Sequence, residues 1–226
     1  MVSVVIPTLN AAASLPRALA PLARPAFEGL VKQVIVSDGG SDDDSIAIAE
    51  AAGCAIVQGP RGRAKQMRAG AALARGRWLL FLHADTALDG GWAAEAHAFM
   101  SERNAQHRAA AFQLAFDDES AAAKRVAFLA NLRARWLKLP YGDQGLLISR
   151  FLYDAVGGFP ELPLMEDVAM VRNIGARRLR ILATRAVTSA EKYRRDGFDK
   201  RAWRNLGLLS RYLLGGDPVE LARRYD

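Results

Sequence analysis

The chain has 226 residues, of which 51% are hydrophobic and 24% are charged. This composition excludes collagen-like, disordered and disulfide-scaffold proteins, and the length is ample for a buried core. A single cysteine, Cys54, excludes an intramolecular disulfide and suits a reducing compartment. No apolar run approaches the ~20 residues that span a bilayer. The N-terminus has no basic stretch ahead of its apolar residues, so we expect a cytoplasmic protein.

The positive charge of the chain is concentrated at the C-terminus. The net charge is +7, yet residues 1–175 hold 18 basic and 18 acidic side chains, whereas residues 176–226 hold 13 and 6. A nucleic-acid binder that is basic throughout would not show this split, so we expect no nucleic-acid partner. The excess suits a solvated tail, or contact with anionic lipid or a phosphate-bearing substrate.

Strands and helices alternate over the first 85 residues. Short apolar runs predict strands over Val2–Ile6, Gln33–Ser37, Cys54–Gln58 and Arg77–Leu82. The segments between them predict helices over Asn10–Ala23, from the N-cap Ser41 to about Ala52, and over Ala64–Ala74. This alternation predicts an α/β fold with a Rossmann-like, mostly parallel sheet flanked by helices.

The alternation loosens after residue 85. Ala109–Phe116 and Gly145–Ser149 are further strand candidates, separated by a predicted helix over Ser120–Leu139. No linker separates two domains. We therefore expect one domain over residues 1–190, followed by a basic, amphipathic, helical C-terminal extension over residues 191–226.

The C-terminal extension mixes apolar and basic residues. Trp203, Leu206 and Tyr212 are spaced for a helical face, with Arg201, Arg204 and Arg211 among them. Such a helix either packs on the domain or lies on an anionic membrane surface. In the second case the protein would be peripheral on the inner face of the membrane.

Polar residues gather where the predicted strands end, and ligands bind beyond the carboxyl ends of the strands in an open parallel sheet. The segments are Pro7-Thr8-Leu9-Asn10, Ser37-Asp38-Gly39-Gly40-Ser41, Gly59-Pro60-Arg61-Gly62-Arg63-Ala64-Lys65-Gln66 and His83-Ala84-Asp85. Each alone is explained by a turn, a helix cap or a solvated helix start. Together they offer carboxylates for a base or ribose edge and for a divalent metal, and a basic loop for phosphates.

These segments resemble the motifs of the inverting family 2 glycosyltransferases of the GT-A fold. The likeness rests on Val2-Ser-Val-Val-Ile-Pro-Thr-Leu-Asn10, Val36-Ser-Asp-Gly-Gly-Ser-Asp42, Phe81-Leu-His-Ala-Asp-Thr86, Tyr141-Gly-Asp-Gln-Gly145, and Gly157-Gly-Phe-Pro160 followed by Leu164-Met-Glu-Asp-Val168. It covers about residues 2–190 and is closest to short, single-domain bacterial members with His-Ala-Asp at the metal motif. The resemblance implies transfer of a sugar from a nucleotide diphosphate to an acceptor hydroxyl with inversion.

The resemblance also implies a donor site. Asp38 would accept a hydrogen bond from the base, expected to be uracil, while Arg63 and Lys65 would face the diphosphate. The expected nucleotide-binding residues are Pro7, Thr8, Asn10, Asp38, Gly39, Arg63, Lys65 and Asp85. The residues expected to bind the donor sugar or the acceptor are His83, Gly142, Asp143 and Gln144. The C-terminal segment would alternatively close over the donor, with Lys192, Arg194 or Arg195 at the diphosphate.

The leaving diphosphate needs a cation, which the resemblance implies to be Mg²⁺ or Mn²⁺. Asp85 is the expected metal ligand. Family members usually carry Asp-x-Asp here, and His83 replaces the first acid. His83 would ligate Mn²⁺, hydrogen-bond the nucleotide or merely pack.

Inversion by direct displacement needs one general base beside the acceptor hydroxyl. Asp167 is the candidate by its place in Glu166-Asp167, and Glu166 would orient it or contact the acceptor. Without the other motifs, this pair would be explained as the acidic start of a helix.

Two other functions remain open from the sequence. A sugar-phosphate nucleotidyltransferase would normally show a glycine-rich first loop with an arginine, which Pro7-Thr8-Leu9-Asn10 does not supply. A non-catalytic nucleotide-sugar-binding protein is favoured by the single carboxylate of His83-Ala84-Asp85. The expected partners of the enzyme are a nucleotide-diphosphate sugar and an acceptor, for which the basic C-terminus suggests a lipid-linked molecule.

Overall fold

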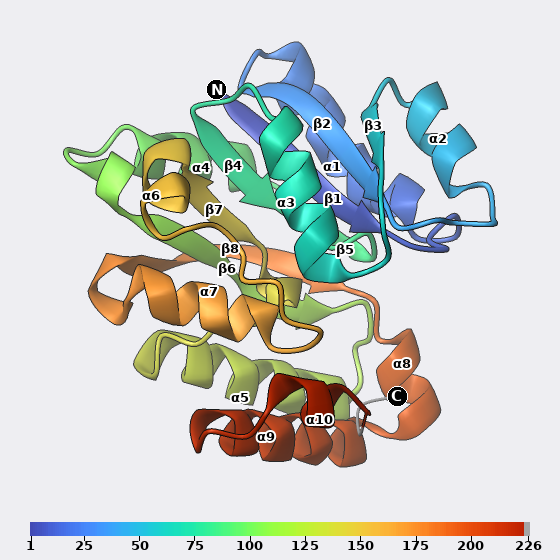
Figure 1. The fold of residues 1–226 in the computed structure, drawn as a ribbon, viewed down its shortest axis with the longest axis vertical. Coiled ribbons are helices and arrows are strands. Elements are labelled where there is room, and N and C mark those ends of the chain that lie inside the picture. The colour runs from blue at the N-terminus through green and yellow to red at the C-terminus, as the bar shows by residue number, and fades with distance from the viewer. Residues whose placement is uncertain (224–226) are drawn as a thin grey trace.

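Eight strands form one sheet in the computed structural model, which describes residues 1–223. The strand order is β3-β2-β1-β4-β7-β6-β8-β5 (Figure 1). The strands are β1 (Val2–Thr8), β2 (Val31–Asp38), β3 (Ala55–Gln58), β4 (Trp78–Phe81), β5 (Thr86–Leu88), β6 (Ala109–Phe116), β7 (Leu146–Ser149) and β8 (Leu179–Thr188).

Six of the strands run in one direction. β1, β2, β3 and β4 pair in parallel, and so do β6 and β8. β7 is antiparallel to both β4 and β6, and β5 is antiparallel to β8. The predicted mostly parallel sheet is therefore confirmed. As a consequence, the carboxyl ends of β1, β2, β4 and β8 point to the same edge.

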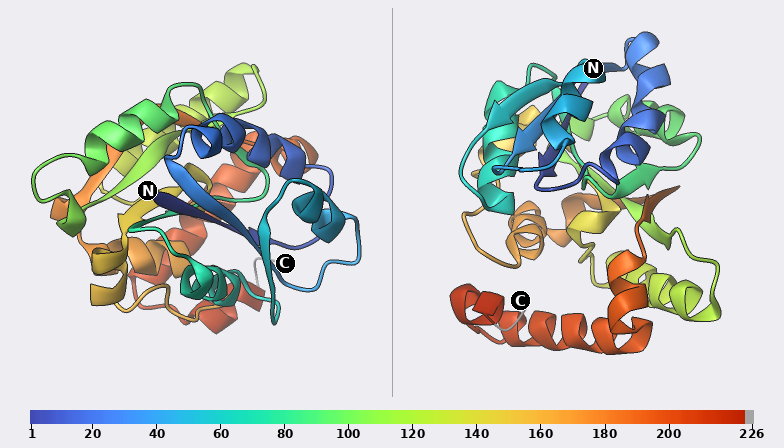
Figure 2. Two further views of the ribbon diagram at one scale, coloured as in Figure 1. Left: turned by 90° about the horizontal axis from the view of Figure 1, so that it is seen from above. Right: turned by 90° about the vertical axis from the view of Figure 1, so that its right-hand side faces the viewer.

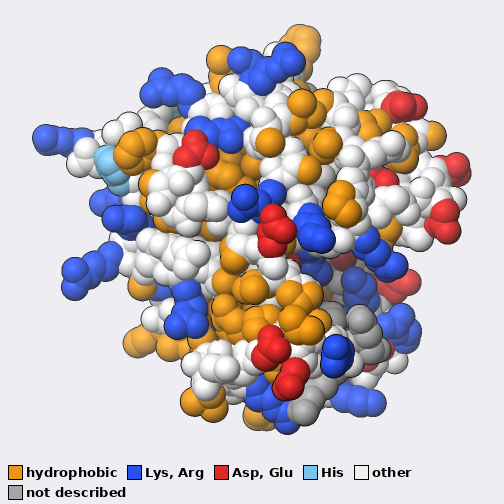
Figure 3. Space-filling view, viewed as in Figure 1, with side chains coloured by type: hydrophobic (Ala, Val, Ile, Leu, Met, Phe, Trp, Pro, Cys, Tyr) orange, Lys and Arg blue, Asp and Glu red, His pale blue; other side chains and the backbone are white. Residues whose placement is uncertain are grey.

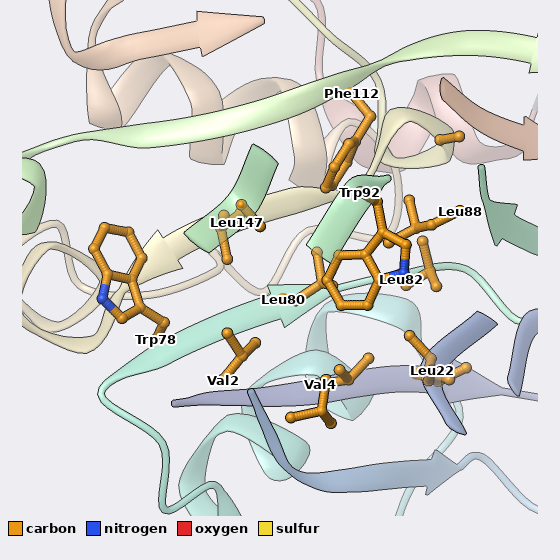
Figure 4. Close-up of a cluster of buried hydrophobic side chains, with 14 of the residues drawn as sticks. Val2, Val4, Leu22, Trp78, Leu80, Leu82, Leu88, Trp92, Phe112 and Leu147 are labelled. Carbon is orange, nitrogen blue, oxygen red and sulfur yellow. The ribbon is translucent and has the colours of Figure 1, made fainter. Parts of the chain in front are cut away.

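Helices cover both faces of the sheet. α1 (Leu15–Phe27) and α4 (Trp92–Met100) pack on one face, against alternate residues of β1 such as Val2 and Val4. Figure 4 shows this cluster, in which Leu80 of β4, Leu147 of β7 and Trp92 lie together. The opposite face of the sheet packs against α3 (Arg63–Leu73), α6 (Arg150–Ala155) and α7 (Glu166–Ile174).

The remaining helices are α2 (Ser45–Ala51), α5 (Ala121–Trp136), α8 (Glu191–Asp196), α9 (Phe198–Leu213) and α10 (Pro218–Arg223). Figures 1 and 2 place α5, α9 and α10 together at the end of the molecule away from the N-terminus. α9 packs against α5 through Ala202, and against the start of α7 through Leu208 and Leu209. The C-terminal helices thus share two apolar clusters with residues 1–190, and the division at residue 190 stays a prediction.

Two helix starts differ from the prediction. α1 begins at Leu15 rather than at Asn10, although Pro16 does lie in its first turn. α2 begins at Ser45 with Asp44 as its N-cap residue, so the prediction of Ser41 as N-cap is wrong. The Ser41 hydroxyl is instead engaged in the loop, where it donates to Asp38 and accepts from the Asn10 N–H.

The expectation that Trp203, Leu206 and Tyr212 share one face of α9 is also wrong. Trp203 and Leu206 are exposed, whereas Tyr212 packs on the buried side. Residues 203 and 212 are nine positions apart, which places them on opposite sides of a 3.6-residue helix. Arg201 lies on the buried side too, where its guanidinium pairs with Asp196 Oδ2 at 2.6 Å.

Candidate active site

A groove of about 550 Å³ lies along the carboxyl ends of β1 and β4. This volume suits a drug-sized ligand. From the predicted nucleotide set, Pro7, Thr8, Asn10, Arg63 and Asp85 line the groove. Two further basic residues line the groove, namely Arg61, which had no predicted role, and Lys192, which was a candidate for the diphosphate.

A second, smaller cavity of about 130 Å³ adjoins the groove. The two share Arg63, His83, Asp85 and Lys192. The smaller cavity adds residues from the middle of the chain and from the C-terminal helices, namely Tyr141, Gly142, Asp143, Asp167, Tyr193, Arg201, Asn205 and Leu208. Motifs far apart in the sequence are therefore brought to one site.

The loop after β2 is held by Asp38, whose side chain is completely buried. Its Oδ2 accepts from the N–H groups of Gly40 and Ser41 at 2.8 Å each, and its Oδ1 accepts from the Ser41 hydroxyl. Asp38 therefore shapes the loop in this structure, and its contact with a base stays a prediction. The Asn10 backbone, at φ 49°, connects the first strand to the same loop.

Gln66 of α3 ties two strand ends together from a buried position. Its Nε2 donates to the carbonyl oxygens of Thr8 at 2.7 Å and Ser37 at 2.8 Å. Gly39 packs against the same amide, and a Cβ at position 39 would lie 3.0 Å from Gln66 Nε2. A side chain at position 39 would therefore have to displace the Gln66 amide by a few tenths of an ångström.

We expect Gln66→Leu to lower the free energy of unfolding by about 2 kcal/mol, because the Thr8 and Ser37 carbonyl groups lose the buried Gln66 donor, although the Gly39 N–H still donates to the Thr8 carbonyl. Chemical denaturation at neutral pH measures this loss. Gln33→Leu is the matched control, since Gln33 donates to the Leu73 carbonyl at an exposed site. Equal stability of the two variants would contradict the role assigned to Gln66.

Asp167 lies at the start of α7 and lines the smaller cavity. Its Oδ2 accepts from the Gly142 N–H and its Oδ1 accepts from the Val168 N–H, each at 2.7 Å. These bonds fix the carboxylate while it remains at the cavity wall. Met165, the residue directly before α7, has a left-handed backbone with φ 64°, which is uncommon for a residue other than glycine and is found more often at functional sites.

Gly142 allows the close packing around this carboxylate. A Cβ at position 142 would lie 2.5 Å from His83 Nε2 and 3.4 Å from Asp167 Oδ2. Only glycine leaves room for the imidazole here. His83, Gly142 and Asp167 therefore form one packed group.

Glu166 points away from Asp167 and toward α3. Its side chain is 2% exposed, and its Oε1 lies 2.9 Å from Arg63 Nη1. Burial raises the pKa of Glu166, and the Arg63 guanidinium opposes this rise. Because Arg63 lines both the groove and the cavity, Glu166 positions a cation at their junction.

Burial lowers the pKa of His83 to about 4, and the Arg63 charge adds to this effect. The imidazole is therefore neutral at neutral pH and has a nitrogen lone pair. Asp85 lines both the groove and the cavity at the end of β4. In residues 1–223, no group of three or more His, Cys, Asp or Glu side chains is arranged to hold a metal ion.

This donor set fits a divalent cation that a substrate helps to bind. Mg²⁺ in phosphate-handling sites is held by one or two carboxylates together with phosphate oxygens. Asp85 supplies a carboxylate beside the basic residues Arg63 and Lys192, where phosphate groups would lie. Asp85 would hold the cation, and the remaining ligands would come from the donor.

Asp143 is buried at the wall of the smaller cavity. Its Oδ1 has no hydrogen-bond partner within the described part of the chain. Burial raises the pKa of Asp143 to about 6, and the nearby Asp167 and Asp85 carboxylates add to the rise, whereas Arg133 opposes it. An unsatisfied buried oxygen at a cavity wall is well placed to bind a hydroxyl group.

Several predicted residues lie outside both cavities. Gln144 is completely buried, and its Nε2 donates to the Phe112 carbonyl at 2.9 Å, so it supports the loop from behind. Lys65 is exposed and is not part of the lining of either cavity. Arg194 pairs with Asp117 and Asp118, and Arg195 pairs with Asp196. Of the three C-terminal cations considered for the diphosphate, the structure brings only Lys192 to the site.

The far wall of the site was not found from the sequence. Thr188 is the last residue of β8 and Ser189 follows it, and the Ser189 N–H donates to the Asp85 carbonyl at 3.1 Å. β8 alternates imperfectly between buried and exposed residues, and its pairing with β6 shifts register between Ala111 and Gln113. That irregularity weakens the period-two pattern by which a strand is recognised.

A family model described as glycosyl transferase family 2 matches residues 3–159, more than half of the chain. The chain therefore belongs to family 2 of the glycosyltransferases, which confirms the resemblance drawn from its motifs. The matched region includes the groove residues Pro7, Thr8, Asn10, Arg63 and Asp85. It ends before Glu166 and Asp167, which lie in the part of the chain outside the match.

Solved structures with the same GT-A fold include residues 1–349 of S. aureus TarS, with a TM-score of 0.65 at 21% identity over 90% of this chain and 63% of that one. Another is glucosyl-3-phosphoglycerate synthase from Mycobacterium tuberculosis in complex with Mn²⁺, uridine diphosphate and phosphoglyceric acid. Its TM-score is 0.61 at 19% identity, over 81% of this chain and 68% of that one. TarS 1–349 is also known in complex with UDP.

A PGL/p-HBAD biosynthesis glycosyltransferase of Mycobacterium tuberculosis is 37% identical over 95 residues, which make up 39% of this chain and 36% of that protein. The match thus spans about a third of the mycobacterial relative's length.

Proposed function

We propose that this glycosyltransferase moves a sugar from a UDP-sugar to an acceptor hydroxyl with inversion at the anomeric carbon. The observation that carries the proposal is the shared cavity. Asp85 and Asp167 line the same space, which is continuous with a groove large enough for a nucleoside diphosphate. A donor-binding groove and a fixed carboxylate beside it are what a single displacement requires.

The donor side of the proposal rests on the groove and on the structural neighbours. The nucleoside would lie along Pro7, Thr8 and Asn10, and the diphosphate between Arg63 and Lys192. Solved neighbours of the same fold bind UDP, and one of them binds Mn²⁺ with it. These neighbours support uridine as the base and a divalent cation as the cofactor.

Asp167 is the proposed general base. Its carboxylate would accept the proton of the acceptor hydroxyl as that oxygen forms a bond to the anomeric carbon. The bond from the same carbon to the diphosphate oxygen breaks, and the electron pair leaves with the diphosphate. A divalent cation held at Asp85 would stabilise the negative charge of the leaving group. The Gly142 and Val168 N–H groups keep the carboxylate in place.

Arg63 is proposed to stabilise the leaving diphosphate directly. Its guanidinium is positioned by the buried Glu166 carboxylate at 2.9 Å, so little side-chain entropy is lost when the phosphate binds. Glu166 is therefore a positioning residue. Asp143, with its unsatisfied oxygen, and His83 are proposed to bind hydroxyl groups of the donor sugar or the acceptor.

Thermal unfolding with a panel of nucleotides, with and without Mn²⁺, tests the donor site. We expect UDP or a UDP-sugar to raise the melting temperature most, by mass action, and Mn²⁺ to increase the rise. In Asp85→Asn, Mn²⁺ should no longer increase the rise in melting temperature that the nucleotide causes. Asp154→Asn is the matched control, because Asp154 is exposed on α6 away from the groove.

Other outcomes separate the alternatives. A rise with a different nucleotide alone would overturn uridine as the base. Release of pyrophosphate from UTP and a sugar phosphate would favour a nucleotidyltransferase. Tight UDP-sugar binding without transfer to any acceptor would favour a non-catalytic binding protein.

A further inference from the structure

Exposed apolar side chains are concentrated on two helices. Of the fourteen large hydrophobic residues that are exposed among those described, nine lie on α5, on α9 or directly after one of them. They are Phe128, Leu129, Leu132, Trp136, Leu137, Trp203, Leu206, Leu213 and Leu214. A soluble surface normally shows such residues singly, and a cluster of them marks an interaction site.

The exposed face of α5 carries an apolar stripe over its second half. Phe128, Leu132 and Trp136 follow one another at four-residue spacing, and Trp136 is 79% exposed. The opposite face of the helix packs on the sheet through Val126 and Ala130. Since the helix already has a buried face, its outer stripe is not needed to hold it in place.

α9 continues the same surface. Trp203 is 72% exposed on its outer side, while Leu208 and Leu209 hold the inner side against α7. The two helices are joined where Arg125 Nη2 donates to both carboxylate oxygens of Asp199 at 2.7 Å. We call the outer sides of α5 and α9, with the residues that directly follow each, the α5–α9 platform.

Basic residues surround the apolar side chains of the platform. They are Lys124, Arg125, Arg135, Lys138, Lys200, Arg204 and Arg211. Three of them pair with acids, namely Lys124 with Glu119, Arg125 with Asp199 and Arg204 with Asp196, so these seven basic residues face three acids. Figure 3 shows hydrophobic, basic and acidic side chains together over the lower half of one face of the molecule, where Figure 1 places α9 and α10. Two copies of this basic surface would repel each other electrostatically, so we do not expect a second copy of the chain to bind to it.

We propose that the α5–α9 platform docks on the surface of an anionic lipid bilayer. Aromatic and leucine side chains would enter the interfacial region, while the lysine and arginine side chains pair with lipid phosphates. The interaction would be peripheral. Within residues 1–223, no helix combines the length and apolarity needed to pass through a membrane.

The platform lies on the outside of the proposed active site. Arg201, Asn205 and Leu208 on the inner side of α9 line the smaller cavity. Docking of the outer side would therefore bring the cavity close to the lipid headgroups, which suits a lipid-linked acceptor. The inference goes beyond the proposed reaction and does not depend on the identity of the donor.

Vesicle sedimentation of the full chain tests the docking surface. We expect about tenfold tighter binding to vesicles of phosphatidylglycerol and phosphatidylcholine than to phosphatidylcholine alone, and weaker binding at high salt. Trp78 and Trp92 are buried, so a blue shift of tryptophan emission on binding would come from Trp136 and Trp203.

Two sets of variants locate the surface. Phe128→Ser with Trp136→Ser, and Arg135→Ser with Lys200→Ser and Arg211→Ser, should each weaken sedimentation about tenfold or more. Arg24→Ser with Lys32→Ser and Arg75→Ser removes the same charge from exposed residues of the N-terminal half and should leave binding unchanged. UDP-induced thermal shifts should persist in all three variants, which shows that they are folded and separates this inference from the donor assignment.

Three results would overturn the inference. One is that the intact chain does not sediment with anionic vesicles. Another is an equal loss of binding in the N-terminal control variant. The third is a dimer in analytical ultracentrifugation that Phe128→Ser with Trp136→Ser converts to a monomer, which would assign the platform to a second copy of the chain.

Discussion

Asp167→Asn is expected to lower the transfer rate by about a thousandfold, because an amide cannot accept the proton of the acceptor hydroxyl. The amide oxygen can still accept the Gly142 N–H bond, so the loop around the cavity should remain in place. UDP binding and the melting temperature should change little. Single-turnover transfer and UDP titration on the same preparation measure both quantities.

Asp154→Asn controls for the loss of one carboxylate, since Asp154 lies on the exposed side of α6. It should retain full transfer. Wild-type rates in Asp167→Asn would remove Asp167 as the base. A loss of UDP binding equal to the loss of transfer would instead assign the residue to the donor site.

Asp143→Asn is expected to stabilise the fold at pH 7.5 by about 3 kcal/mol while lowering transfer. The folded-state pKa of Asp143 is about 6, against 3.8 for an unperturbed aspartate. The folded protein therefore binds the proton more tightly than the unfolded chain, and ionisation at neutral pH costs about 3 kcal/mol at ~1.4 kcal/mol per pKa unit. Asparagine avoids this cost because it carries no charge.

The same difference predicts a pH dependence. Because the folded-state pKa is raised, the stabilising effect is complete below about pH 4 and is lost as pH rises through about 6. In wild-type protein, this group should lower the free energy of unfolding across that window, and the contribution should be absent in Asp143→Asn. Chemical denaturation of the wild-type protein and Asp143→Asn over this pH range, with EDTA present, measures the contribution of Asp143. Parallel pH profiles would contradict the buried, ionisable state of Asp143.

Much of the fold could be predicted because local patterns and packing agree. The strand over Ala109–Phe116 was predicted with its observed bounds, since it is apolar and bounded by polar residues. The helix predicted over Ser120–Leu139 is observed over Ala121–Trp136, where the Ser120 hydroxyl stabilises its start by accepting from the Ala123 N–H. β8 was missed because its alternation is interrupted by a register shift.

The candidate site was only partly predictable, because side-chain direction depends on tertiary packing. Asp85 and Asp167, which the motifs named, line one cavity in the structure, and their roles stay predictions. The motifs could not show that Gln144 turns inward to the Phe112 carbonyl, or that Asp38 is engaged by its own loop. Nor could they show Arg201 and Asn205 at the cavity, since α9 reaches it only through contacts with α5 and α7.

The two sides of α9 have a thermodynamic consequence. Its inner residues form part of the cavity wall, and its outer residues are exposed on the surface of the protein. If α9 takes a different position when the cavity holds a ligand, then ligand binding in the cavity and binding of the outer side to a surface affect each other. Equilibrium linkage then requires reciprocity. If binding to a surface raises the affinity of the cavity for its ligand by some factor, a bound ligand raises the affinity of the protein for that surface by the same factor.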